Sequence, residues 1–140
     1  MINRELINPQ SIVVVGGSNN VHKPGGRLVR NLLDGKYKGE LYVVNAKEDD
    51  VQGLKSYHSV HDIPETELAI ISIPGPACPE AVDVLAKQKN VKAFIVISAG
   101  FGEETHEGAI LEEQMLKSIN EAGASLIGPN CIGLMNMHYH

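Results

Sequence analysis

Five short apolar runs, separated by segments of helical period, constrain the fold more than any other feature of this sequence. Each run is rich in valine or isoleucine, and the runs cover residues 11–16, 40–45, 67–74, 92–98 and 125–129. Because these runs are almost continuously apolar, they are typical of parallel strands buried on both faces. We therefore expect a Rossmann-like α/β fold, a doubly wound and mainly parallel sheet of about five strands with helices on both faces.

The segments between the strands predict three helices. Val29, Leu32 and Leu33 form one apolar face after the first strand, and Gly35 is expected to end that helix in a left-handed conformation. Pro76 suits the start of a second helix that runs to about residue 89. A third helix is predicted over residues 103–122, with Gly123 ending it and an inward face made of Leu111, Met115, Ile119 and Ala122. Residues 51–64 have a weaker pattern, and no regular element is assigned to them.

Charge and composition exclude several classes of function. The 140 residues fit one domain, and 12 basic against 17 acidic residues give a net charge of -5, which favours neither nucleic acid nor an anionic membrane surface. No run approaches the ~18 to 20 apolar residues of a membrane span, and residues 1–10 lack the apolar stretch of a signal peptide. The two cysteines have no zinc-ligand spacing, and His58 and His61 are expected to be exposed, so no metal site is predicted. A soluble cytoplasmic protein is expected.

The loop after the first strand, "GGSNNVHKPGG", is the strongest candidate for a binding site. Gly16 and Gly17 allow the backbone to approach a ligand, and free amides at the next helix start attract a phosphate. The dinucleotide fingerprint Gly-x-Gly-x-x-Gly is absent, because Ser18 stands two places after Gly16. A P-loop is also excluded, since Lys23 precedes its glycines. The loop therefore predicts a phosphorylated ligand without naming it.

The loop after the second strand narrows the choice of ligand. An NAD site usually ends this strand with an acid that holds the ribose hydroxyls, but here the strand ends in Asn45 with Lys47 two residues later. A lysine favours a phosphorylated ribose, either the 2'-phosphate of NADP or the 3'-phosphate of coenzyme A (CoA). The acids of residues 48–50 oppose this charge unless they turn away from it.

Seven motifs, taken in order, extend this pattern along the whole chain. They are "VVVGGS", "KPGGRLVRNLL", "YVVNAK", "GLKSYHSVHDIP", "LAIISIPGPACPEAV", "FIVISAGFGE" and "LIGPNCIGLMN". Together they resemble the N-terminal CoA-binding domain of the nucleoside-diphosphate-forming acyl-CoA synthetases. This is the family of ADP-forming acetyl-CoA synthetase and of the succinyl-CoA synthetase α subunit.

The resemblance implies a set of residues that contact CoA. It puts Ser18 and the turn at residues 23–26 near the phosphates, Lys47 at the nucleotide end, and the ends of the third and fourth strands along the pantetheine arm. Asn130 and Cys131 match a Gly-Pro-Asn-Cys turn near the thiol, which resembles a structural element more than a nucleophile. The CoA-binding residues expected are Gly16, Gly17, Ser18, Lys23, Gly25, Gly26, Asn45, Lys47, Ile73, Pro74, Ser98, Ala99, Gly100 and Asn130.

The resemblance also implies a reaction, in which acyl-CoA, a nucleoside diphosphate and phosphate give the carboxylate, CoA and a nucleoside triphosphate. Synthetases of this kind pass phosphate through a histidine in a later domain and bind the nucleotide in a grasp-type domain. We expect residues 1–140 to be one CoA-binding domain, the N-terminal piece of a longer synthetase, with those domains as its partners. No catalytic residue is assigned, and the piece alone is expected to be inactive. The alternatives are a non-catalytic CoA-sensing or regulatory module and an NADP-binding redox domain.

Overall fold

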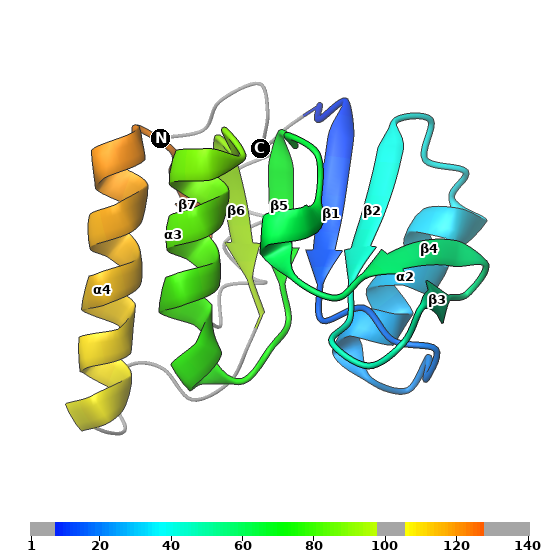
Figure 1. The fold of residues 1–140 in the computed structure, drawn as a ribbon, viewed down its shortest axis with the longest axis horizontal. Coiled ribbons are helices and arrows are strands. Elements are labelled where there is room, and N and C mark those ends of the chain that lie inside the picture. Colours follow the sequence, from blue (N-terminus) through cyan, green and yellow to red (C-terminus); the bar gives the residue numbers. More distant parts are fainter. Residues whose placement is uncertain (1–7, 98–105, 128–140) are drawn as a thin grey trace, which may run out of the picture.

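The sheet has seven strands in the order β3-β4-β2-β1-β5-β6-β7 in the computed structural model, which describes residues 8–97 and 106–127 (Figure 1). The strands are β1 (Ser11–Val15), β2 (Glu40–Val44), β3 (Asp50–Val51), β4 (Leu54–Tyr57), β5 (Leu68–Ile71), β6 (Ala93–Val96) and β7 (Ser125–Ile127). Neighbouring strands pair in parallel, except that β3 runs antiparallel to β4. All five strands expected from the sequence are present.

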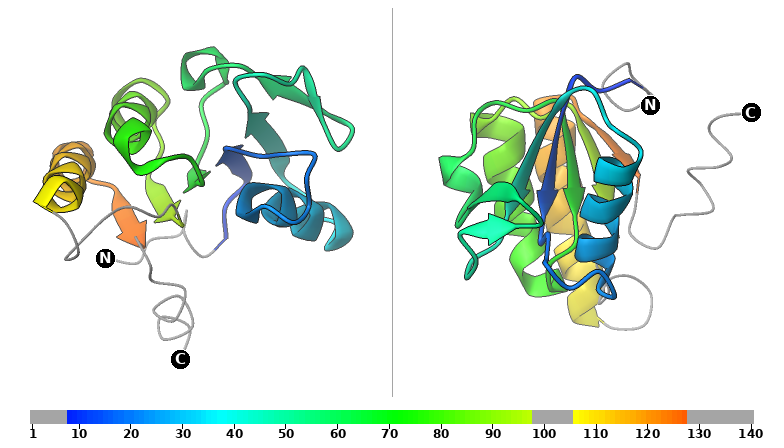
Figure 2. Two further views of the ribbon diagram at one scale, coloured as in Figure 1. Left: turned by 90° about the horizontal axis from the view of Figure 1, so that it is seen from below. Right: turned by 90° about the vertical axis from the view of Figure 1, so that its right-hand side faces the viewer.

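Helices cover both faces of the sheet. Figure 2 shows α2 (Pro24–Asp34) on one face and α3 (Cys78–Gln88) and α4 (His106–Ala122) on the other. The short 3-10 turns η1 (Val60–Asp62) and η2 (Gly75–Ala77) complete the elements of the described residues. The predicted doubly wound α/β fold is therefore confirmed, with two more strands than expected.

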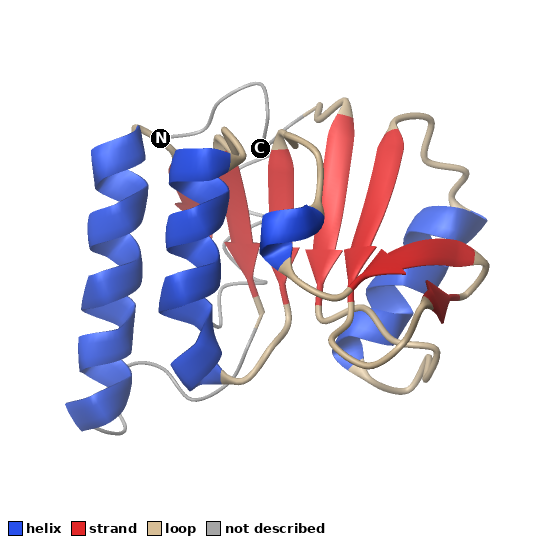
Figure 3. Cartoon of the chain, in the orientation of Figure 1, coloured by secondary structure: helices blue, strands red, loops and turns tan. Residues whose placement is uncertain are grey.

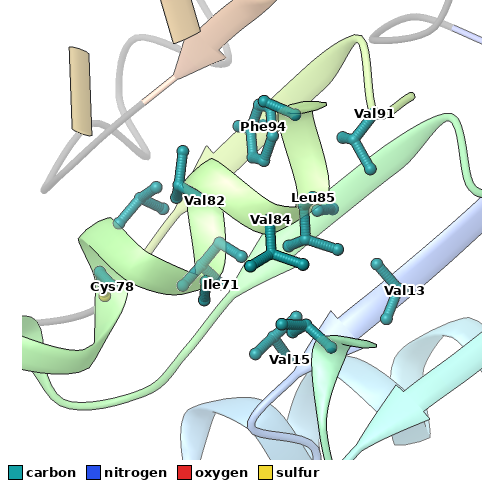
Figure 4. Packing of buried hydrophobic residues seen from close by; sticks show 14 of the residues in the cluster. Val13, Val15, Ile71, Cys78, Val82, Val84, Leu85, Val91 and Phe94 are labelled. Carbon is teal, nitrogen blue, oxygen red and sulfur yellow. The ribbon is translucent and has the colours of Figure 1, made fainter. Parts of the chain in front are cut away.

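Each central strand is buried on both faces, as its continuous apolar sequence requires. In β1, Val13 and Val15 face the helices α3 and α4, while Ile12 and Val14 belong to the cluster on the α2 side, and none of the four is more than 4% exposed. Figure 4 shows the first cluster, where Val13, Val15, Ile71 and Phe94 from the strands pack against one face of α3, which contributes Val82 and Leu85. The two clusters fix the register of the strands and hold their carboxyl ends at one edge.

The ends of the helices agree with the sequence in one case and differ in another. Gly123 follows the last residue of α4, as expected, and has φ +69°, in the left-handed region. The expectation for Gly35 was wrong, because Gly35 keeps helical φ (-77°) and Lys36 takes the left-handed position (φ +55°). The helix extends one residue further because N–H groups of Lys36 and Tyr37 then reach the carbonyls of Leu33 and Leu32, both at 3.1 Å, in a Schellman motif.

Residues 51–64 form the part of the fold that the sequence left unassigned. They contain the end of β3, all of β4 and η1. The hairpin turns at Gln52 (φ +51°) and Gly53 (φ +89°), and two central residues with positive φ are typical of a type I′ turn. A two-residue strand is too short to show alternation, which explains why the pattern alone did not reveal it.

Helix α4 places the predicted residues on its inner face. Met115 and Ile119 are buried, and Leu111 and Ala122 pack against the same core while partly exposed. The helix is described from His106, and residues 103–105 of the predicted span lie outside the described residues. Across the ranges that the structure describes, no helix is long and apolar enough to cross a membrane.

Candidate functional site

A cleft opens at the carboxyl edge of the sheet, where the strand order reverses. Strand β1 pairs with β2 on one side and with β5 on the other, and a ligand in an open α/β sheet binds outside such a switch point. The loops that follow these strands meet at the lower edge in Figures 1 and 3. The cleft has a volume of about 290 Å³ and is lined by Gly16, Gly17, Ser18, Lys23, Pro24, Gly25, Asn45, Ser72, Ile73 and Pro74.

A larger hollow lies at the opposite edge of the sheet. It measures about 570 Å³ and is lined by residues that precede β1 and β2, among them Pro9 and Tyr37. Size alone would favour this hollow, but it lies away from the carboxyl ends of the strands and from any helix start. The geometry therefore favours the smaller cleft.

The glycines of the first loop allow backbone segments to touch. Gly16 has φ +95°, and a Cβ there would overlap the carbonyl oxygen of Ser72 at the end of β5. A Cβ on Gly25 would overlap the carbonyl oxygen of Gly16, so the start of α2 lies directly on the loop. Gly17 and Gly26 are buried and equally crowded. The glycine spacing thus serves this contact between β1, β5 and α2, which differs from the arrangement that the dinucleotide fingerprint builds.

The start of α2 points free amides at the cleft. Lys23 is the N-cap without a side-chain cap, Pro24 occupies the first position, and the first turn carries no acid. The N–H of Arg27 bonds to the Lys23 carbonyl at 2.9 Å, whereas the N–H groups of Gly25 and Gly26 donate to no described residue. Unpaired amides and the helix dipole give this end a partial positive charge. The arrangement suits an anion such as a phosphate group.

Asn45 connects the second loop to the first. Its Nδ2 donates to the carbonyl of Gly17 at 2.8 Å, and its Oδ1 accepts the N–H groups of Lys47 at 2.8 Å and of Glu48 at 3.0 Å. The amide of Asn45 is therefore engaged with backbone at both ends. Its clearest role is to hold the turn that leads to Lys47 against the first loop.

Lys47 lies just outside the residues that line the cleft, and its side chain is exposed. Two of the neighbouring acids contact groups other than Lys47. Asp49 Oδ1 lies 2.7 Å from Nε2 of His58, and Asp50 Oδ1 accepts the N–H of Gly53 at 3.1 Å. Neither carboxylate forms an ion pair with Lys47 in the part of the chain that the structure describes.

The end of β5 forms the other wall of the cleft. Ile73 and Pro74 line it, and the buried thiol of Cys78 lies 3.6 Å from the carbonyl oxygens of both. The remaining predicted positions, Ser98, Ala99, Gly100 and Asn130, lie outside the described residues, as does Cys131. The structure thus brings together the predicted residues at the ends of β1, β2 and β5.

Sequence reasoning missed one residue that is bound to this loop, Gln52. Its Nε2 donates to the carbonyls of Ser18 at 2.8 Å and of Gly26 at 2.9 Å. Asn19 supports the same contact, because its Oδ1 accepts the N–H of Gln52 at 2.7 Å and its Nδ2 donates to the Asp50 carbonyl at 2.9 Å. The Gln-Gly pair was the available signal for a turn, but the partners of its side chain are far away in the sequence.

Comparisons with known proteins identify the family of the chain. The sequence matches the protein family described as "CoA binding domain" over residues 10–137. It is 40% identical over 135 residues to the α subunit of ADP-forming acetate–CoA ligase II from Pyrococcus furiosus, covering 95% of this chain and 29% of the relative. It is 39% identical over 134 residues to ADP-forming acetate–CoA ligase II from Archaeoglobus fulgidus, covering 95% of this chain and 20% of the relative.

A solved structure extends the likeness to three dimensions. The dinucleotide-forming acetyl-coenzyme A synthetase 1 of Ca. Korarchaeum cryptofilum, in complex with phosphate and ADP, matches with a TM-score of 0.82 and 36% identity. The match covers 91% of this chain and 27% of that one. This chain therefore spans less than a third of the length of each of these relatives.

Proposed function

The chain belongs to the family of CoA-binding domains, and from that premise we propose that it binds CoA or acyl-CoA in the cleft between β1 and β5. The uncapped start of α2, placed together with Ser18 and Lys23 at the switch point of the sheet, is the observation that carries the proposal. Preformed amide donors at this position suit the diphosphate of CoA, because its negative charge is attracted by backbone N–H groups and by the positive end of the helix dipole.

The rest of the CoA molecule extends from the diphosphate in two directions. The 3'-phosphate of the ribose lies toward Lys47, whose charge is not matched by Asp49 or Asp50. The pantetheine arm runs along Ile73 and Pro74; the resemblance also assigns residues 98–100 to this arm and Asn130 to the thiol end, and these positions lie outside the described residues. The chain holds and orients the thiol, and none of its described residues is assigned a chemical step.

The longer protein is an acyl-CoA synthetase of the nucleoside-diphosphate-forming kind. Two relatives are named ADP-forming acetate–CoA ligases, so acetate and ADP are the first substrates to test. In that reaction acyl-CoA and phosphate give an acyl phosphate and CoA, the phosphoryl group passes from the acyl phosphate to a histidine with release of the carboxylate, and the nucleoside diphosphate then accepts it from the histidine to give the nucleoside triphosphate. The histidine and the nucleotide site belong to partner domains, and this chain contributes the binding site for CoA.

Titration calorimetry of the protein with CoA, 3'-dephospho-CoA, NADPH and NADH tests the proposal. We expect CoA to bind best, 3'-dephospho-CoA to bind more weakly, and NADH to give no heat of binding. Tighter binding of NADPH than of CoA would instead assign the cleft to the NADP-binding class. A CoA-sensing module would pass this titration, so ATP formation from acetyl-CoA, ADP and phosphate by the protein with its partner domains separates the synthetase from the sensor.

A further inference from the structure

Gln52 does not line the cleft, but its side chain bonds to the loop that forms the cleft. We propose that Gln52 is a positioning residue for the CoA phosphates, and that its side-chain amide holds the first loop in the geometry that binds them. The inference rests on the proposed function, because it names a residue that prepares the same site. It concerns the shape of the loop and requires no contact between Gln52 and CoA.

The amide of Gln52 joins the two ends of the loop. Its Nε2 bonds to the carbonyl of Ser18, just after β1, and to the carbonyl of Gly26, in the first turn of α2. One planar group thus fixes the distance between the Ser18 turn and the amides at the start of α2. Those are the groups that must converge for one diphosphate to contact them all.

The orientation of this amide is determined by its partners. Rotating it by half a turn would place Oε1 against two carbonyl oxygens, which offer no hydrogen to share. Gln52 Oε1 is buried without a partner among the described residues. Leaving an acceptor unpaired is costly, so the two hydrogen bonds to the loop are the contacts that this arrangement preserves.

The backbone of Gln52 supports the same conclusion. At φ +51° it adopts a conformation that favours glycine, and Gly53 beside it already supplies one flexible position in the turn. The hairpin alone therefore does not require a glutamine. The backbone of the turn is also held against the loop, because the N–H of Gln52 and the carbonyl of Asp50 both bond to the side-chain amide of Asn19.

Three variants separate a positioning role from a structural one. Gln52→Gly removes the amide and suits the left-handed backbone, while Gln52→Met keeps the length of the side chain without its donors. Lys36→Gly is the matched control, since Lys36 also has positive φ (+55°) but follows α2 at the far edge of the sheet. The dissociation constants for CoA and 3'-dephospho-CoA and the melting temperature are measured for each variant.

We expect both Gln52 substitutions to raise the dissociation constant for CoA on the order of tenfold. This is the effect expected when two modest hydrogen bonds no longer order the loop. Because the loop contacts the diphosphate, the dissociation constant for 3'-dephospho-CoA should rise by the same factor. The melting temperatures of both variants should stay within a few degrees of that of the unaltered protein. Lys36→Gly should leave both dissociation constants within about twofold of it.

The outcomes distinguish this inference from the proposed function. If the unaltered protein binds CoA and both Gln52 variants bind it equally well, the positioning role is wrong while the proposed function stands. If both variants lose binding only in proportion to a large fall in melting temperature, Gln52 serves the fold alone, which also overturns the inference. If the unaltered protein does not bind CoA, both fail together.

Discussion

Individual residues at the carboxyl edge either build the cleft or remain available to a ligand. Gly16 and Gly25 build it, because side chains there would overlap backbone atoms of Ser72 and Gly16. Lys23 and Lys47 are exposed and make no ion pair with any residue of the described ranges. In a chain with net charge -5, Lys23 is the N-cap of an uncapped helix start and Lys47 lies in the loop after β2, so both cations belong to loops at the carboxyl edge.

Lys47→Ala is predicted to weaken the binding free energy of CoA by about 1.5 to 3 kcal/mol, the range for a charge-assisted hydrogen bond. Because the proposed partner is the 3'-phosphate, 3'-dephospho-CoA should bind the variant and the unaltered protein equally. Titration calorimetry of both ligands measures this difference. Lys38→Ala, an exposed lysine that precedes β2 at the opposite edge, is the control. Equal weakening of both ligands would show that Lys47 does not contact the 3'-phosphate.

Among the elements, α3 and α4 are joined by a polar network outside the core. Lys87 Nζ lies 2.9 Å from Asp83 Oδ1 and 2.8 Å from Glu121 Oε1, and the Ser118 hydroxyl donates to Asp83 at 2.9 Å. The hydrogen bond from Lys87 lowers the pKa of Asp83, with a further contribution from Ser118, and it also lowers the pKa of Glu121. The hydrogen bond to Glu121, followed by that to Asp83, raises the pKa of Lys87.

Lys87→Met is predicted to lower the melting temperature in a pH-dependent way. Carboxyl groups with a depressed folded-state pKa stabilise the fold above their unfolded pKa of about 4, and this contribution disappears as pH falls through the folded pKa. The difference from the unaltered protein should therefore be full near pH 7 and shrink toward pH 3. Arg30→Met, which removes the single pair with Asp34 on α2, should show a smaller dependence. A pH-independent difference would mean that only packing is lost.

The elements also show how far the sequence determines the fold. The five main strands were predictable because burial on both faces requires continuous apolar runs, and the cleft followed because parallel strands end at one edge. The exact end of α2 was not, since backbone hydrogen bonds of Lys36 and Tyr37 decide it. Gln52 was also beyond reach, because its partners Ser18 and Gly26 are 34 and 26 residues away and meet it only after the sheet has formed.

In the whole molecule, ligand binding raises the free energy of unfolding, because a ligand in the cleft binds only the folded state. The cleft is lined by residues at the ends of β1, β2, β5 and α2, so a ligand can bind there only when most of the sheet has formed. A ligand that binds the native state alone stabilises it by about 2.7 kcal/mol at a hundredfold excess over its dissociation constant. For a domain of this size, that corresponds to roughly 8 °C in melting temperature.

Saturating CoA is therefore predicted to raise the melting temperature of the protein by several degrees, as measured by thermal unfolding followed by circular dichroism. NADH at the same concentration is the control and should leave the transition unchanged. Acetyl-CoA should act like CoA, because the proposed contacts lie on the nucleotide and the diphosphate. A transition that ignores CoA at every concentration would contradict the proposed site.

The bonds between the β3–β4 hairpin and the first loop have a consequence for evolution. The Asn19 side chain bonds to the backbone of the hairpin at Gln52 and Asp50, and the Gln52 side chain bonds to the backbone of the loop at Ser18 and Gly26, so the two side chains hold the same contact between hairpin and loop. Selection on one should then act on both, and the two positions are expected to co-vary among homologues. Lineages that replace the glutamine should carry a compensating loop sequence.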